Sequence, residues 1–145
     1  MSSRPEGIHE ICNGYVDDYA AAHPVEATEL GVPGHDDKLT DYSPDGLAAR
    51  AELARRALAA VRAAEPADDS ERVAQAVFTE RTGLAVELHD ASLDLAQLNT
   101  VASPVHEIRM AFDLMPTETP EQWATLAARL GVVPAALDGY RTSLL

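Results

Sequence analysis

The chain has 145 residues, of which 46% are hydrophobic and 24% charged, and its formal net charge at pH 7 is −13. This composition is typical of one folded globular domain and excludes a disordered chain. The acidic balance disfavours nucleic acid and anionic membrane surfaces as partners, because both are bound through clustered Lys and Arg side chains.

The start of the chain, residues 1–7, lacks the apolar core of a signal peptide, and no stretch of the sequence reaches transmembrane length. We therefore expect a cytoplasmic protein. Cys12 is the only cysteine, so an internal disulfide and a cysteine-based zinc site are both excluded. Its place on an apolar helix face predicts a small buried side chain.

The first expected helix runs from about Glu6 to Ala22, where His23-Pro24 ends it. Its apolar residues recur at intervals that place them on one face of a helix. They are Ile8, Ile11, Cys12, Tyr15, Val16 and Tyr19. A short helix over 24–30 follows, and then an ordered loop over 32–42 that is rich in proline, glycine and aspartate.

Ser43-Pro44 predicts a capped helix start, and the helix continues to about Ala64. The longest helix is expected from Asp69 or Ser70 to about Leu98, where Leu84, Leu88, Ala91, Leu95 and Leu98 form an apolar seam. Gly83 interrupts that helix, which predicts either a close neighbouring backbone or a bend.

Three more helices are expected, over 103–114, from Thr119 to about Gly131, and from Pro134 to the end. No segment alternates like a strand. The sequence therefore predicts an all-α fold, an irregular array of about seven helices without a sheet.

The sequence stops at Leu144-Leu145, in the middle of an apolar helical pattern and without a capping glycine or polar tail. We expect residues 1–145 to form a single helical segment from the front of a longer polypeptide. The alternative is a complete small domain whose last leucines dock into its core.

The histidines give no metal site by spacing. A zinc helix places a second histidine four residues after the first, but Met110 stands there after His106-Glu107, and Asn13 stands there after His9. A thioether and a neutral amide are poor zinc ligands. Both matches are interpreted as accidental.

Two further clusters are interpreted as structural. His35-Asp36-Asp37 lacks the acidic spacing of a calcium loop and is read as turn capping. His89 and Asp90 on the long helix are expected at the surface. Nucleophile elbows, phosphate loops and dinucleotide fingerprints are absent from the sequence.

Four segments, read in order, resemble one bacterial family. They are residues 19–31 (YAAAHPVEATELG), 32–46 (VPGHDDKLTDYSPDG), 98–116 (LNTVASPVHEIRMAFDLMP) and 133–145 (VPAALDGYRTSLL). Together they resemble the amino-terminal helical part of the Domain of Unknown Function 885 family. The resemblance implies a longer, mostly helical protein similar to zincin-type metallopeptidases or related hydrolases.

In that family the later half carries a His-Glu motif followed by Pro-Gly-His-His. The segment 32–35 (VPGH) shares three letters with the second motif but lacks the His-Glu and the second histidine. No catalytic, cofactor-binding or metal-ligating residue is therefore carried over to this chain. We expect no cofactor in this chain, while the resemblance implies zinc for the full-length family.

The leading hypothesis is a non-catalytic amino-terminal helical portion of a zinc-dependent peptidase or hydrolase. It is expected to be inactive alone and to pack on, or shape the cleft of, an absent carboxyl-terminal catalytic part. The rival hypothesis is a free-standing helical interaction module that dimerises through exposed apolar helix faces such as the Leu84–Leu98 seam.

Overall fold

The computed structural model describes residues 7–145, and within them it contains six helices and no strand. The helices are α1 Ile8–Ala22, α2 Pro24–Glu29, α3 Pro44–Ala63, α4 Asp69–Asp90, α5 Pro104–Leu114 and α6 Pro120–Ser143. The all-α class expected from the sequence is confirmed. Glu6, where the sequence places the start of the first helix, lies outside the described residues. No helix of this region is both long enough and apolar enough to cross a membrane.

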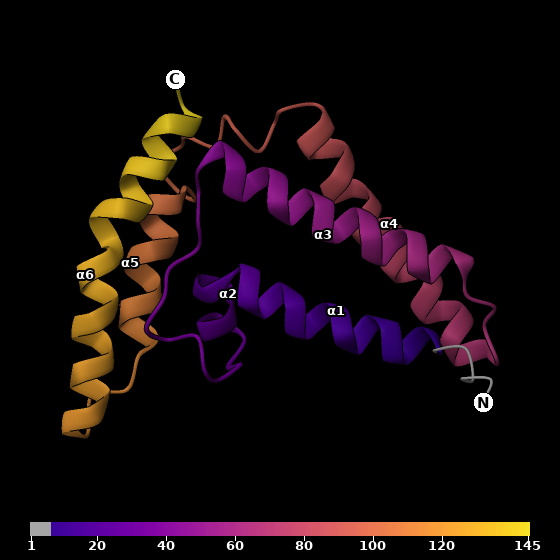
Figure 1. The fold of residues 1–145 in the computed structure, drawn as a ribbon, viewed down its shortest axis with the longest axis horizontal. Helices are drawn as coiled ribbons and strands as arrows, with labels where there is room; N and C mark the ends of the chain where they lie inside the picture. The colour runs from indigo at the N-terminus through magenta and orange to yellow at the C-terminus, as the bar shows by residue number, and fades with distance from the viewer. Residues whose placement is uncertain (1–6) are drawn as a thin grey trace.

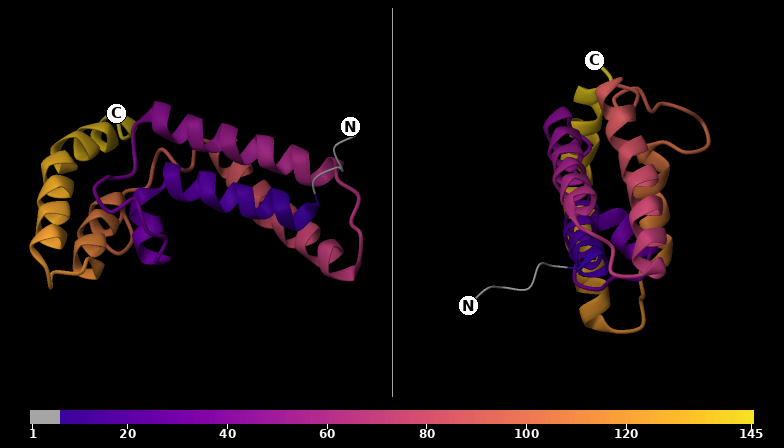
Figure 2. Two further views of the ribbon diagram at one scale, coloured as in Figure 1. Left: turned by 60° about the horizontal axis from the view of Figure 1, so that its bottom comes forward. Right: turned by 90° about the vertical axis from the view of Figure 1, so that its right-hand side faces the viewer.

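The molecule is elongated and arched, with two groups of helices at opposite ends (Figures 1 and 2). At one end α1, α3 and α4 pack on one another, and at the other end α5 packs against α6. The short helix α2 contacts both α1 and α5, and α3 also contacts α6. These contacts join the two groups near the middle of the molecule.

Helix α3 has the start and the apolar face that its sequence predicts. The Ser43 hydroxyl accepts a hydrogen bond from the backbone N–H of Gly46 at 3.1 Å, which satisfies one of the unpaired N–H groups of the first turn. Its buried face includes Ala51, Ala54, Leu58 and Val61. Small alanines let α1 and α4 approach this face closely.

Helix α4 ends at Asp90, eight residues before the expected end at Leu98. Ser92 adopts a left-handed conformation, with φ of 58°. The N–H of Ser92 bonds to the carbonyl of His89 at 2.8 Å, and the N–H of Leu93 bonds to that of Leu88 at 2.9 Å. This pair of bonds is a Schellman motif. A serine occupies the position that glycine usually signals, so the sequence pattern missed the helix end.

Helix α6 runs unbroken from Pro120 to Ser143, so the two last helices expected from the sequence are one. Thr119 and Gln122 form a capping box at its start. Pro134 lies inside the helix, where it removes one backbone hydrogen bond, and α6 curves along its length (Figure 2). The helix continues past Gly131 because packed residues hold it on both sides of this point, Arg129 before it and Tyr140 after it.

Arg129 links α6 to α2 and to the loop that follows α2, which are distant from it in the sequence. Its side chain is 0% exposed, and it donates hydrogen bonds to the carbonyl of Pro24 at 2.9 Å, the carbonyl of Lys38 at 2.8 Å and the hydroxyl of Thr28 at 2.9 Å. Asp36 lies 3.9 Å from the guanidinium. The cation thus orders α2 and the loop after it against α6.

Two details of the expected faces differ from the structure. Val16, placed on the buried face of the first helix, is half exposed. Cys12, expected to be buried, is partly exposed and forms no disulfide.

A cluster around Tyr42, Ile108, Ala136 and Tyr140 forms the core at the α5–α6 end.

Candidate functional site

A cavity of about 350 Å³, lined by both apolar and polar side chains, lies where the two groups of helices meet, and every helix from α1 to α6 contributes lining residues. This volume lies within the range of small-molecule sites, about 300–1,000 Å³. Its polar and ionisable lining side chains are Tyr15, Tyr19, His23, Glu26, Thr40, Tyr42, Arg50, His89, Asp94, Gln97, Glu107, Tyr140 and Ser143.

Two tyrosine–glutamate pairs stand in this cavity. The Tyr19 hydroxyl donates a hydrogen bond to Glu26, and the Tyr42 hydroxyl donates one to Oε2 of Glu107 at 3.0 Å. Burial, together with the neighbouring glutamate, raises the pKa of Tyr19 and of Tyr42 well above the ordinary value. Both hydroxyls therefore stay protonated and act as donors, and the glutamates act as acceptors.

His23 and Arg50 lie beside these pairs. The His23 ring stacks on Tyr19, with ring centroids 4.0 Å apart. Burial, and then the charge of Arg50, lowers the pKa of His23 to about 3, so this imidazole is neutral at pH 7. Arg50 donates to the carbonyl of Asp41, and its guanidinium lies 5.9 Å from the centre of the Tyr42 ring.

The turn after α4 brings a histidine and an aspartate together at the cavity wall. Nδ1 of His89 lies 2.6 Å from Oδ2 of Asp94. The other carboxylate oxygen of Asp94, Oδ1, is buried and has no hydrogen-bond partner among residues 7–145. The Schellman motif at Ser92 reverses the chain and places Asp94 beside the helix end, a position that a continuous helix would not allow.

The donors of the cavity are spread over its walls. In the part of the chain that the structure describes, no three His, Cys, Asp or Glu side chains gather closely enough to hold a metal ion.

Comparison with protein families matches residues 24–145 to the family described as "Bacterial protein of unknown function (DUF885)". The chain belongs to this family. A search of curated proteins finds no match.

The DUF885 match covers α2 to α6 and leaves α1 outside it. Glu26, Arg50, His89, Asp94 and Glu107 therefore lie within the matched region. The aromatic side chains that α1 adds to the cavity precede it. All the carboxylates of the cavity, together with Arg50 and His89, thus lie in the family region, whereas His23 precedes it.

The two His-Glu pairs with zinc-like spacing are in different surroundings. His106 is bonded through Nδ1 to the hydroxyl of Ser103 at 2.8 Å, and Met110 is half exposed. His9 is exposed and lies 3.3 Å from the hydroxyl of Ser70. Glu107, dismissed with the rest of its pair, is a cavity residue.

His89 corrects the expectation of a surface histidine, because it lines the cavity. Asp90 is exposed and paired with Arg55, as a surface residue would be. In the segment His35-Asp36-Asp37, Asp36 accepts a hydrogen bond from the hydroxyl of Thr28 at 2.8 Å, and it belongs to the hydrogen-bond network around Arg129. A carboxylate beside apolar residues was the local signal that could have indicated the cavity, as at Asp94 between Leu93 and Leu95 and at Glu107 before Ile108.

Proposed function

We propose that this chain is the non-catalytic amino-terminal helical portion of a cytoplasmic zinc-dependent peptidase or hydrolase of the DUF885 family. In this proposal it packs on a catalytic part and forms one wall of its cleft. The support comes from an uncovered apolar surface, from its position next to the cavity and from the bonding of the candidate ligands.

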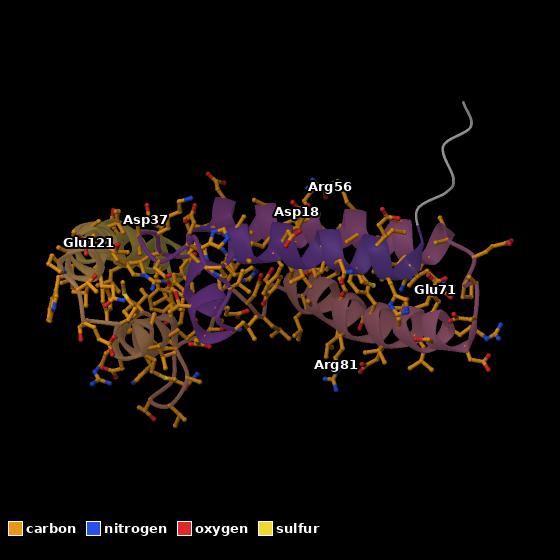
Figure 3. The ribbon with its side chains drawn as sticks, turned by 90° about the horizontal axis from the view of Figure 1, so that it is seen from below. Asp18, Asp37, Arg56, Glu71, Arg81 and Glu121 are labelled. Atoms are coloured by element: carbon orange, nitrogen blue, oxygen red, sulfur yellow. The ribbon has the colours of Figure 1, made fainter. Side chains whose placement is uncertain are left out.

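The observation that carries the proposal is an apolar stripe along the outer side of α4. It consists of Val73, Val77, Leu84 and Leu88, which follow one another at helical spacing and are 40% to 64% exposed. Arg81, on the same side of the helix, points away from α1 and α3 (Figure 3). Arg81 interrupts the stripe between Val77 and Leu84, and a long side chain of this kind can lay its apolar stem along a covered surface while its charge stays in water. Exposed apolar residues gathered on one side of a helix are typical of a packing interface.

The stripe leads to the cavity. Leu88 belongs to both, and Leu93, which is also exposed, lines the cavity as well. A partner that covers the α4 stripe therefore reaches the cavity wall. This continuity supports a role in shaping a cleft at the boundary with the partner.

The candidate ligands of this chain are already engaged with one another. Glu107 accepts from Tyr42, His89 pairs with Asp94, and His106 pairs with Ser103. The proposal therefore assigns the zinc ligands to the catalytic part, where the family resemblance places the His-Glu and Pro-Gly-His-His motifs.

The test is co-expression of this chain with the family segment that carries those two motifs. We expect a stable one-to-one complex, with peptide hydrolysis that a chelator abolishes and added zinc restores. The chain alone is expected to hydrolyse nothing. Chelator-sensitive hydrolysis by the purified chain alone would contradict the proposal, as would the failure of the two parts to associate.

A variant on the stripe sharpens this test. Leu84→Asp places a charge in the proposed interface and should abolish the complex, because a charged side chain is costly to bury without a partner. Leu130→Asp is the matched control, since Leu130 is similarly exposed but lies on α6. The control should assemble normally.

The same α4 stripe supports a second candidate function, a free-standing module that dimerises through it. Light scattering of the chain alone separates the two. A defined dimer that Leu84→Asp converts to monomer favours the interaction module. A monomer, or association without a defined size, that resolves into a one-to-one complex with the catalytic part favours the first proposal.

A further inference from the structure

We propose that the cavity between the two groups of helices is a binding site for the protonated primary amine of a small organic molecule. This inference rests on the cavity alone and does not need a catalytic partner. Its test therefore uses the chain by itself and is separate from the co-expression experiment.

The charges on the cavity walls favour a cation. The carboxylates of Glu26, Asp94 and Glu107 line the cavity, against the single guanidinium of Arg50 among the lining residues. His23 adds no charge because it is held neutral. An anionic ligand would have to approach these carboxylates, whereas an ammonium group is attracted to them.

Acceptor capacity remains on two of these carboxylates. Glu26 accepts a hydrogen bond from Tyr19, and Glu107 accepts one from Tyr42. A carboxylate has about four acceptor positions, so one hydroxyl donor leaves room for others, and an ammonium group offers three N–H donors and no acceptor.

The aromatic rings explain why the ligand is an organic ammonium and not a metal ion. Tyr15, Tyr19, Tyr42 and Tyr140 line the cavity, and aromatic rings offer apolar surface that packs on the carbon atoms of an organic molecule. The described donors do not gather as a metal requires. A cavity of about 350 Å³ also has room for a carbon skeleton attached to the amine.

Four probes of matched shape test the charge requirement on the unmodified chain. L-Leucinamide and isoamylamine carry an ammonium group at about pH 6.5, N-acetyl-L-leucinamide is neutral, and N-acetyl-L-leucine is an anion. Binding is followed by nuclear magnetic resonance of the backbone amides. We expect both amines to shift the resonances of cavity residues, with the neutral probe at least about tenfold weaker, as expected for losing a charge-assisted hydrogen bond.

The order of the two amines identifies the source of the group. Tighter binding of L-leucinamide indicates a peptide amino terminus, and equal binding indicates a simple amine; either result supports the proposal. Neutral and cationic probes that bind equally would overturn it. So would tighter binding of the anion, because that would make Arg50 the determinant.

A pair of variants on α5 locates the site. Glu107→Gln keeps an oxygen to accept from Tyr42 but removes the charge, and it should weaken amine binding about tenfold. Asp113→Asn on the same helix removes a charge that is exposed and paired with Arg109, and it should leave binding unchanged. Equal effects of the two variants would contradict the assignment. If Glu107→Gln fails to fold by circular dichroism, Asp94→Asn takes its place, and the probe series stands independently.

Discussion

The two ends of the molecule are held together by different interactions. At the α3–α4 end the contact is apolar and alanine-rich, with Ala54, Leu58 and Val61 buried along α3. At the α6 end the apolar cluster around Tyr42 is joined by one fully buried cation, Arg129, which bonds to the loop and helix that precede α3. The first is a broad contact of many small contributions, while the second concentrates its hydrogen bonds on one side chain.

This difference bears on what each end tolerates. Apolar packing loses free energy in proportion to the atoms removed and the cavity that remains. A buried polar network loses more free energy of unfolding per substitution, because removing its donor leaves several acceptors unpaired. The two ends should therefore respond differently to single substitutions.

The largest effect is expected at Arg129. Arg129→Met keeps most of the side-chain length but strands the carbonyls of Pro24 and Lys38, and should lower the free energy of unfolding by about 3–4 kcal/mol. Urea unfolding followed by circular dichroism measures it. Arg109→Met, at an exposed ion pair on α5, is the control and should cost less than about 0.5 kcal/mol. A similar small cost at Arg129 would remove the proposed contrast between the ends.

The apolar end should lose less per substitution. Leu58→Ala removes a side chain that is 6% exposed and should cost about 2–3 kcal/mol. Val73→Ala on α4, where the side chain is 64% exposed, should change stability by no more than about 0.5 kcal/mol. If Leu58→Ala exceeded Arg129→Met in the same urea series, the order of the two ends would be reversed.

The junction between the ends should be sensitive to acid through His23. Its pKa is lowered from 6.5 to about 3 on folding, so below pH 6.5 the unfolded chain binds a proton that the folded chain does not. Stability should therefore fall as pH drops from about 6.5 toward 3, by about 1 kcal/mol per pH unit. The measurement is the free energy of unfolding at about pH 6.5 and pH 5.

His23→Gln should remove this part of the pH dependence, so that the wild type loses about 1–2 kcal/mol more than the variant over that interval. His9→Gln, where the ring is exposed on α1, is the matched control and should behave as the wild type does. Parallel pH curves for the wild type and His23→Gln would show that the ring is not buried as a neutral group.

The smallest effect is a gain at Gly83. A Cβ there would meet only a side-chain nitrogen of Arg62, at 3.8 Å, so the close backbone approach expected from the sequence is absent within the described residues. Gly83→Ala should raise the unfolding free energy by up to about 1 kcal/mol. Gly46→Ala is the contrasting case, because its Cβ would lie 2.3 Å from the carbonyl oxygen of Asp41. A loss at Gly83 as large as that at Gly46 would show that the α3–α4 contact tolerates no added methyl group.

The starts of the helices were predictable because their signals are local. Ser43-Pro44 and Thr119-Pro120 each place a capping hydroxyl next to a proline that suits the first turn, and both hydroxyls accept the expected N–H bonds. The apolar face of α3 was predictable for the same reason, since periodicity needs only neighbouring residues. Ser103 is the exception, because its hydroxyl bonds to the ring of His106.

The cavity was not predictable in this way. Its lining residues extend from Tyr15 to Ser143 and come from every helix, so no window of sequence contains them together. His89 illustrates the difficulty, because its role depends on Asp94, and that pairing depends on a serine in a left-handed turn.

The amino-acid order alone determined the helical class, the capped starts and the buried stripe of α3, because each depends on contacts within a few residues. Only the three-dimensional structure showed that α4 ends at Asp90, and only tertiary contacts decided that α6 continues through Pro134 and that Arg129 is buried. The burial of Arg129 depends on partners about a hundred residues away, as in its bond to Pro24, where the separation is 105 residues. The physical reason is that a polar group accepts burial only where the fold supplies its hydrogen-bond partners.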